Sequence, residues 1–364
     1  MRVSGPAPVK VAMICPYSMS RPGGVQGQVL GLARELRKLD VDVRIVAPCD
    51  GPPPESTIVS VGPTVEWESN GSIAPIAPGR ATVRRTAEAL RSLEPDVVHL
   101  HEPVVPGPTV SALIGFNGPM VGTFHAAGEV PYQWLRPALR SIMMRLTYRV
   151  AVSESARETA AANWTGAPYT VLWNGIEIER VAAATPAPSS RPTVLFIGRH
   201  EPRKGLDVLL DAWTGIDRDA RLRVIGVGPQ TDELKRRAIG DVEWLGTVTD
   251  IPRNELLRGA TAFCAPSLRG ESFGVVLLEA MAAGAPIVAS AIEGYQNVAR
   301  AGEDALLVPP GDVPALREAL QRLLDDPGLR ARLVASGRER AEQFSMRRLA
   351  ERYLELYERA LVPA

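Results

Sequence analysis

Short runs rich in valine and isoleucine alternate with longer amphipathic stretches along almost all of the 364 residues. This alternation predicts parallel sheets covered by helices on both faces, because parallel strands buried on two sides are apolar throughout and need crossover helices. Strands are expected in the first half at Val9–Cys15, Val41–Ala47, Val97–His101, Met120–His125, Arg149–Val152 and Tyr169–Trp173. A second series is expected at Thr193–Ile197, Leu222–Val227, Val242–Leu245, Ala262–Ala265, Pro286–Ser290 and Ala305–Val308.

The two series predict an α/β chain of two Rossmann-like, doubly wound domains with a cleft between them. The N-terminal domain is expected to span residues 1–181 and the C-terminal domain residues 193–345. Residues 182–192, rich in Pro, Ala and Ser, predict a linker. Residues 346–364 contain an amphipathic helix, which is expected to pack back across the hinge onto the N-terminal domain.

Charge and cysteine usage limit the class of partner and the compartment. The 41 basic and 41 acidic residues leave no net charge, which argues against extensive nucleic-acid binding. The three cysteines, Cys15, Cys49 and Cys264, are far apart in the chain and predict buried thiols in a reducing compartment, the cytoplasm. No metal-ligand spacing is present, so no metal is expected.

Neither a secretory signal nor a membrane span is expected. The first ten residues lack the apolar core of a signal peptide. The apolar stretch 275–292 is interrupted by Glu279, Gly284 and Pro286, which predicts a helix, a turn and a strand instead of a span.

The strongest local signal is RGESFGVVLLEA, residues 269–280. Glu271 lies in a loop before a predicted helix whose first turn begins near Gly274. The unpaired N–H groups at Ser272, Phe273, Gly274 and Val275 suit a phosphate or a sugar oxygen.

Glu279 lies inside this predicted helix among apolar neighbours. A buried carboxylate needs hydrogen-bond donors, and the two hydroxyls of a ribose are suitable donors. A carboxylate satisfied by backbone or arginine, or one facing solvent, is an equally good interpretation.

A second signal is IGRHEPRKG, residues 197–205, which follows a predicted strand. It places Arg199 and Lys204 at the carboxyl end of that strand, where α/β folds bind ligands. Two fixed cations there can neutralise the charge of a departing diphosphate, as Mg²⁺ does in other enzymes. A solvated basic loop is the alternative.

Two further features follow strands of the first half. Gly23 and Gly24, at the start of a predicted helix, allow a close approach of backbone to ligand, although a plain tight turn is the alternative. His125 ends a strand and so faces the expected cleft, although a lone histidine is commonly structural.

Taken together, the motifs resemble glycosyltransferase family 4, retaining enzymes with the two-domain GT-B fold. They are GGV at Gly23, HEP at His101, FH at His125, GRxxxxKG at Arg199 and ESFGxxxxEA at Glu271. The resemblance implies that Arg199 and Lys204 hold the donor's diphosphate. It implies that Glu271 and the backbone of residues 272–275 hold the sugar and phosphate, and Glu279 the ribose.

The resemblance also implies that His125, Gly23 and Gly24 contact the sugar and the acceptor. The catalytic residues implied are His125, Arg199, Lys204 and Glu271. Retention then proceeds by front-face attack, in which the leaving phosphate accepts the proton of the acceptor hydroxyl.

Further motifs are CPYS at Cys15, PGGVQ at Pro22, NGS at Asn70 and EAMAAG at Glu279. Within the family these resemble actinobacterial phosphatidylinositol mannosyltransferases, which implies GDP-mannose as donor and a phosphatidylinositol acceptor. The segment GTVTDIPR, residues 246–253, is similar to their base-binding loop. There Val248 offers backbone, Asp250 can accept hydrogen bonds from guanine, and Arg253 can stack on the base. A helix-capping Asp250 is the alternative.

The acceptor site implied by this resemblance consists of Tyr17, Pro22, Asn70, Ser72 and His125. Two positions depart from the subfamily pattern: Pro75 stands where it has arginine, and Ala126 where it has threonine. Both changes remove candidate contacts to the inositol phosphate.

Peripheral binding to the inner face of the membrane is expected from a basic helical stretch. Its residues are Arg80, Arg84, Arg85 and Arg91, with Tyr132, Trp134, Met143 and Met144 as apolar anchors. A solvated helix face is the alternative.

Three other classes of protein remain open. A family 4 enzyme can use another nucleotide sugar and a soluble or glycan acceptor. A nucleotide-sugar epimerase can share the fold and would turn over donor without acceptor, and a third class binds donor without catalysis. A metal-dependent transferase would need Asp-x-Asp at a strand's carboxyl end, whereas Asp40-x-Asp42 and Asp217-x-Asp219 precede strands.

Overall fold

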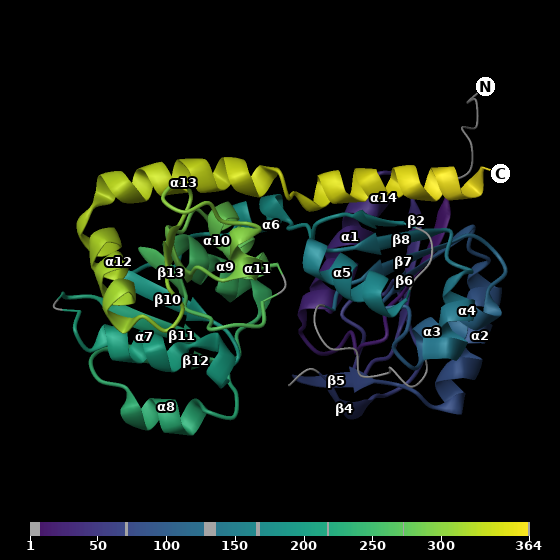
Figure 1. Ribbon diagram of the computed structural model, residues 1–364, viewed down its shortest axis with the longest axis horizontal. Coiled ribbons are helices and arrows are strands. Elements are labelled where there is room, and N and C mark those ends of the chain that lie inside the picture. The colour runs from purple at the N-terminus through teal and green to yellow at the C-terminus, as the bar shows by residue number, and fades with distance from the viewer. Residues whose placement is uncertain are drawn as a thin grey trace. The chain divides into compact units, whose positions relative to one another are not determined.

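The computed structural model describes residues 8–69, 72–126, 136–164, 168–216, 218–271 and 273–362. The chain forms two compact units, which we describe one at a time (Figure 1). The N-terminal unit consists of residues 1–175 and 346–364, and the C-terminal unit of residues 176–345.

The sheet of the N-terminal unit has the strand order β3-β2-β1-β6-β7-β8-β9, and its neighbours pair in parallel. Its strands are β1 (Lys10–Ile14), β2 (Asp42–Ala47), β3 (Ile58–Ser60), β6 (Val97–His101), β7 (Met120–Phe124), β8 (Tyr148–Ala151) and β9 (Tyr169–Val171). A separate antiparallel pair joins β4 (Val65–Ser69) to β5 (Ser72–Ile76).

Helices cover both faces of this sheet, because its strands are apolar on both sides. They are α1 (Gly24–Lys38), α2 (Arg80–Leu93), α3 (Pro108–Gly115), α4 (Arg136–Met143), α5 (Glu154–Asn163) and α14 (Met346–Leu361). In β1, Val11 and Met13 enter the core shared with α1 and α14, whereas Ala12 and Ile14 enter the core on the other face. The period of two along the strand thus supplies two hydrophobic cores at once.

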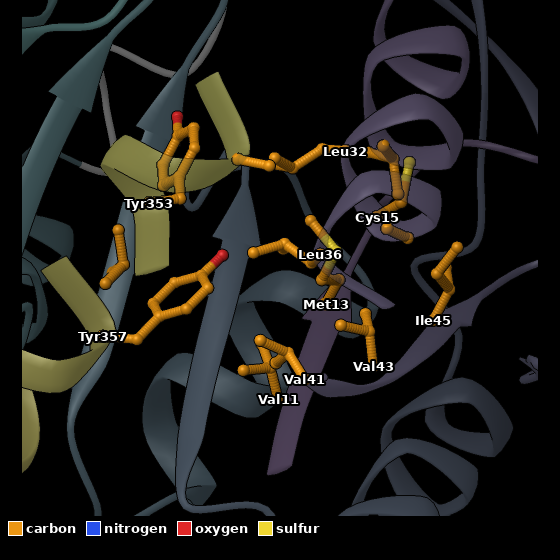
Figure 2. Close-up of a cluster of buried hydrophobic side chains, with 14 of the residues drawn as sticks. Val11, Met13, Cys15, Leu32, Leu36, Val41, Val43, Ile45, Tyr353 and Tyr357 are labelled. Carbon is orange, nitrogen blue, oxygen red and sulfur yellow. The ribbon is translucent and has the colours of Figure 1, made fainter. Parts of the chain in front are cut away.

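The C-terminal helix α14 completes the first of these cores. Figure 2 shows Tyr353 and Tyr357, one helical turn apart on α14, beside side chains of β1 and α1. Each tyrosine hydroxyl reaches a buried polar group: Tyr357 Oη lies 2.7 Å from His99 Nδ1, and Tyr353 Oη lies 2.8 Å from Thr123 Oγ1. The amphipathic stripe of α14 therefore covers β6 and β7 as well as α1.

The sheet of the C-terminal unit has the order β12-β11-β10-β13-β14-β15, again with parallel neighbours. Its strands are β10 (Thr193–Ile197), β11 (Arg221–Ile225), β12 (Val242–Gly246), β13 (Ala262–Ala265), β14 (Ile287–Ser290) and β15 (Leu306–Val308). Its helices are α6 (Ile178–Ala182), the 3₁₀ turn η2 (Pro202–Lys204), α7 (Leu206–Trp213), α8 (Thr231–Arg237), α9 (Asp250–Gly259), α10 (Val275–Ala283), α11 (Glu293–Gln296), α12 (Val313–Asp325) and α13 (Pro327–Glu342).

These sheets confirm the prediction of two parallel, doubly wound domains. Strand order reverses between β1 and β6 in one unit and between β10 and β13 in the other, and ligands bind at the carboxyl ends of strands at such points. Sequence reasoning missed β3, which is short, and the β4–β5 pair. The dipeptide Asn70-Gly71, flanked by segments in which polar and apolar residues alternate, was the sequence signal that could have predicted this hairpin.

The boundary between the units lies earlier than the sequence suggests. The chain passes from one unit to the other at Gly175 and Ile176, and residues 182–192 lie within the C-terminal unit. Ala187 N donates to Glu255 O of α9 at 2.8 Å, and Arg258 donates to Ala182 O. These hydrogen bonds attach the Pro- and Ala-rich segment to α9, so it is not a free linker.

The variant Tyr357→Phe tests the attachment of α14. Loss of the hydroxyl leaves the buried His99 nitrogen without its partner, which costs about 1–3 kcal/mol. We expect chemical denaturation to show a decrease of that size in the free energy of unfolding. Arg347→Ala, which breaks a solvent-exposed pair with Glu351 on the same helix, is the matched control and should change it by less than about 0.5 kcal/mol. Equal effects of the two variants would contradict the role of Tyr357.

Candidate functional site

Lys204 and Glu271, predicted from separate motifs, meet at the carboxyl ends of β10 and β13. Lys204 Nζ lies 2.5 Å from Glu271 Oε1, and the two side chains are 19% and 14% exposed. Arg203, which was not predicted, lies 3.4 Å from the same oxygen and donates to Gly270 O at 3.0 Å. A carboxylate and two cations therefore share one small, partly buried site.

Arg199 is exposed directly after β10, next to this site in sequence. The neighbouring backbone is tightly packed, because a Cβ on Gly226 would lie 1.9 Å from Gly198 O. Gly226 also has a φ of 123°, which other residues rarely adopt. The turns after β10 and β11 thus depend on glycine, and they determine where Arg199 leaves the sheet.

The segment before α10 is anchored by an aromatic ring. Phe273 is buried and its ring centroid lies 5.6 Å from that of Phe344, so only its backbone can face a ligand. Gly274 adopts a φ of 85° as N-cap, and Val275 begins the helix. Ser272, predicted in the same cradle, lies outside the described residues. The first N–H groups of α10 carry the positive end of its dipole.

Ser267 and Tyr295, which the sequence analysis did not identify, form a chain of hydrogen bonds to the Glu271 carboxylate. Ser267 Oγ lies 3.2 Å from Glu271 Oε1 and 2.9 Å from Tyr295 Oη. Burial raises the pKa of Tyr295, which keeps its hydroxyl protonated, so Tyr295 donates to Ser267 and Ser267 donates to the carboxylate. A Cβ on Gly294 would lie 1.8 Å from Glu271 O, so only glycine lets α11 approach this closely.

Arg253 and Glu279 are paired with each other. Arg253 Nη2 and Nη1 donate to the two carboxylate oxygens at 2.9 and 3.1 Å. One alternative for Glu279, a carboxylate satisfied by arginine, is thus present in the structure. The roles of Glu279 toward a ribose and Arg253 toward a base stay predictions.

The predicted base-binding loop is short. Val248 lies between β12 and α9, and Asp250 is the first residue of α9 after the N-cap Thr249. Asp250 is 60% exposed and lies 3.3 Å from Arg180. It is therefore a first-turn residue of the helix, where a negative charge is favourable, and its oxygens remain accessible to solvent.

In the N-terminal unit, His125 belongs to a group of histidines at the ends of β6 and β7. His125 Nε2 lies 3.0 Å from His101 Nδ1. Glu102 Oε1 accepts the backbone N–H groups of His125 and Ala126, both at 2.7 Å. The role of Glu102 was missed, and the HEP motif was the only signal that pointed to it.

Burial sets the protonation of this group. It lowers the pKa of His125 to about 4 and that of His99 to about 3, and it lowers the pKa of His101 as well. Burial also raises the pKa of Glu102 to about 7. The histidines are therefore neutral near pH 7, and can act as hydrogen-bond donors or acceptors but not as cations.

The other predicted residues of this unit lie on the loop after β1 and on the β4–β5 pair. Tyr17 forms an isolated bridge with Ile76 of β5, and Ser18 N donates to Pro75 O at 3.2 Å, so the two segments are joined. Pro22, Gly23 and Gly24 are exposed at the start of α1. Ser72 begins β5, and Asn70 lies outside the described residues.

The predicted membrane-facing residues are only partly on the surface. Met144 is 60% exposed, whereas Met143 is buried, so Met143 is wrong as an anchor because it fills the core beneath α4. Arg85 donates to Val61 O at 3.4 Å. Tyr132 and Trp134 lie outside the described residues.

The described residues contain neither a candidate metal-ion cluster nor a candidate membrane-spanning helix. Within these ranges, no three or more His, Cys, Asp or Glu side chains are grouped so as to hold a metal ion. No helix there has the length and apolar character needed to cross a bilayer.

Comparisons with known proteins identify the family. A model described as Glycosyltransferase Family 4 matches residues 22–180, and one described as Glycosyl transferases group 1 matches residues 191–326. Over 364 aligned residues the chain is 38% identical to phosphatidyl-myo-inositol mannosyltransferase of Mycobacterium leprae, with 96% of each chain covered. The chain belongs to glycosyltransferase family 4.

Further comparisons agree with this family 4 membership. The chain is 36% identical over 370 residues to the phosphatidyl-myo-inositol mannosyltransferase of Mycobacterium tuberculosis H37Rv, covering 96% of this chain and 97% of the relative. A crystal structure of a glycosyltransferase from Rickettsia africae matches with a TM-score of 0.77 at 20% identity, covering 98% and 100%. Anabaena HepE in complex with UDP and glucose matches with a TM-score of 0.74 at 18% identity, covering 96% and 99%. The predicted GT-B class of this family 4 chain is confirmed.

The buried histidines predict how stability depends on pH. Above about pH 6.5 they are neutral in both states, and at lower pH the unfolded chain takes up protons that the folded chain resists. Thermal unfolding should therefore show that stability falls as the pH drops from about 6.5 toward 4. Glu102 acts in the opposite direction, because its raised pKa lets the folded state bind a proton more tightly.

Two variants separate these contributions. His125→Gln removes one of the histidines that resist protonation in the folded state, so stability should fall less steeply as the pH drops. Glu102→Gln removes the carboxyl group that acts in the opposite direction, so stability should fall more steeply. A pH profile that is the same in both variants would contradict the assigned pKa directions.

Proposed function

We propose that this family 4 glycosyltransferase transfers mannose from GDP-mannose to a phosphatidylinositol-type lipid acceptor, with retention of the anomeric configuration. The observation that carries the proposal is the contact of Lys204 with Glu271 next to the N-terminus of α10. The mannose and the lipid are supported by the names of relatives that are 35–38% identical over 96% of this chain.

The C-terminal unit supplies the donor site in this proposal. A nucleotide diphosphate brings negative charge, and Arg199, Arg203 and Lys204 lie on the turn that follows β10. The first N–H groups of α10 can hold the phosphate next to the sugar. Preorganised cations stabilise the charge that develops as the glycosidic bond breaks. We therefore propose that transfer needs no metal ion.

Glu271 accepts hydrogen bonds from the sugar hydroxyls in this proposed site. Its Oε1 already accepts from Lys204 and Ser267, which holds the carboxylate in one orientation. A carboxylate can accept further hydrogen bonds from two vicinal hydroxyls through Oε2. The side chain is 14% exposed, so part of it remains open to a ligand.

The base is recognised by the segment at the start of α9. Asp250 has accessible acceptor oxygens, which suit the N1–H and N2–H₂ donors of guanine. Arg253 is held by Glu279 through its terminal nitrogens, which leaves the flat face of the guanidinium for stacking on the base.

In the N-terminal unit of this proposal, His125, the loop from Tyr17 to Gly24 and strand β5 bind the acceptor and the sugar. His125 is neutral, so it serves as a hydrogen-bonding group and not as a cation. In front-face attack the leaving phosphate accepts the acceptor's proton, and no enzyme nucleophile is needed. An epimerase would instead turn over donor in the absence of acceptor.

We further propose that the enzyme binds peripherally to the cytoplasmic face of an anionic membrane. In the N-terminal unit α2, α3 and α4 lie side by side (Figure 1). Exposed side chains of α2 and α3 include Arg80, Arg84, Val83 and Ile114, and Met144 is exposed directly after α4. Cations beside protruding apolar groups suit anionic headgroups. The buried, free cysteines agree with a reducing compartment.

Thermal-shift measurements with GDP, UDP, ADP and their sugars test the donor. At one ligand concentration, about a hundredfold above the Kd for GDP, GDP should stabilise the protein by about 2–3 kcal/mol and GDP-mannose by more. Lys204→Ala should lose most of this stabilisation, whereas Glu271→Ala should keep the effect of GDP but lose the additional effect of the mannose. Both variants should abolish transfer to phosphatidylinositol vesicles, and the chelator EDTA should leave wild-type transfer unchanged.

Arg218→Ala, in an exposed pair with Asp325, is the control and should behave like wild type. Stabilisation by UDP compounds alone would overturn the donor assignment. Full transfer by Lys204→Ala or Glu271→Ala would overturn the site, and donor turnover without acceptor would favour the epimerase.

Vesicle co-sedimentation tests the membrane proposal. The double variant Arg80→Ala/Arg84→Ala should bind vesicles of phosphatidylinositol and phosphatidylcholine at least about tenfold more weakly, since each basic residue near an anionic surface contributes about 1 kcal/mol. Arg347→Ala/Arg352→Ala, on α14, is the matched control and should bind like wild type. Unchanged binding by the α2 variant, or equal binding to purely zwitterionic vesicles, would contradict the proposal.

A further inference from the structure

His101 and Glu102 are adjacent residues that contact His125 in two different ways. His101 reaches the side chain, with Nδ1 at 3.0 Å from His125 Nε2. Glu102 reaches the backbone, with Oε1 accepting from His125 N and Ala126 N at 2.7 Å. The end of β6 therefore contacts three atoms at the end of β7, namely His125 Nε2, His125 N and Ala126 N.

The position of Glu102 has a free-energy cost in both its side chain and its backbone. Its side chain is buried, which penalises the charged carboxylate, and its φ of 52° lies in the left-handed region. For a residue other than glycine this backbone costs roughly 1–2 kcal/mol. Strain of this kind persists where surrounding contacts over-determine it, and it gathers at functional sites. Glu102 N also donates to Thr123 O at 2.8 Å, which extends the β6–β7 ladder to this point.

The ring of His101 packs against the ring of His99. The two ring centroids lie 4.2 Å apart. Both nitrogens of His99 are engaged, Nδ1 with Tyr357 Oη and Nε2 with Thr123 Oγ1, each at 2.7 Å. His101 thus lies on a fixed surface that includes α14.

Hydrogen bonding decides which nitrogen of His125 carries the proton. Both rings are neutral, so each has one N–H, and only one N–H can lie between His101 Nδ1 and His125 Nε2. If His125 donated, the proton of His101 would be on its buried Nε2, which has no partner among the described residues. A buried N–H without an acceptor is rarer and costlier than a bare lone pair. The favoured state has His101 Nδ1–H donating to His125 Nε2.

We propose that His101 and Glu102 are positioning residues, which hold His125 in its Nδ1–H tautomer with a fixed backbone. His125 then presents a hydrogen-bond donor, through Nδ1, to an oxygen of the bound sugar or acceptor. The contact with substrate rests on the proposed function, whereas the tautomer and its cause do not.

Nitrogen NMR of the full chain with ¹⁵N-labelled histidine tests the tautomer directly. The sequence contains only four histidines, so the His125 signals can be assigned by their loss in His125→Gln. Near pH 8 we expect His125 Nδ1 to show the shift of a protonated ring nitrogen and Nε2 that of an unprotonated one. The reverse assignment would overturn the proposal. This measurement uses no substrate, so its outcome is separate from that of the transfer reaction.

Matched variants test the positioning role. His101→Asn keeps an N–H donor near the position of Nδ1 and should preserve the His125 tautomer. His101→Ala should give a mixture of tautomers and lower kcat at least tenfold, with little change in the KM for donor. A single Nδ1–H tautomer and wild-type kcat in His101→Ala would overturn the proposal.

Glu102 is tested in the same way. Glu102→Gln keeps an acceptor oxygen for the two backbone N–H groups, and Glu102→Ala removes it. We expect kcat to fall at least tenfold more in Glu102→Ala than in Glu102→Gln. Equal kcat values in the two variants would show that the backbone contact does not position His125. If either alanine variant fails to fold, the NMR of wild type and His101→Asn still decides the tautomer.

Discussion

Burial of parallel strands on both faces is the constraint on which the rest of this structure depends. Val11 and Met13 fill one core while Ala12 and Ile14 fill the other, so β1 has no side left for chemistry. Polar groups are then confined to the turns that follow the strands. At these carboxyl ends the structure places His101, Glu102 and His125 in one unit, and Arg199, Lys204 and Glu271 in the other. The fold thus creates the candidate sites as a consequence of its packing.

Each candidate site is supported by residues that belong to the core. Tyr295 is buried, yet through Ser267 it orients Glu271. Tyr357 and Tyr353 of α14 are buried as well, and their hydroxyls satisfy His99 and Thr123 beneath the His101–His125 pair. Because an unpaired buried polar group is expensive, these contacts connect the stability of each unit to the geometry of its site. A helix from the far end of the sequence thereby becomes part of the surroundings of a predicted catalytic histidine.

The two sites use charge in opposite ways. The C-terminal unit gathers cations and a helix N-terminus around one carboxylate, which suits a ligand that brings its own negative charge. The N-terminal unit keeps its histidines neutral by burial, which suits hydroxyl groups. The division agrees with a family whose substrates are a nucleotide sugar and an acceptor hydroxyl, and it explains why the same type of sheet carries different chemistry in each half.

The sequence by itself determined most strands of the two parallel sheets and the polar residues that follow them, because these follow from local periodicity and from the position of polar residues after apolar runs. Lys204, Glu271 and His125 were predicted on this basis, and the family was predicted from the resemblance of the motifs around them. Only the tertiary structure decided the partners. That Arg253 pairs with Glu279, that Tyr295 supports Glu271, and that Glu102 holds the backbone of His125 depend on contacts between distant segments. No local pattern encodes such contacts, since they arise when strands and helices pack in one particular order.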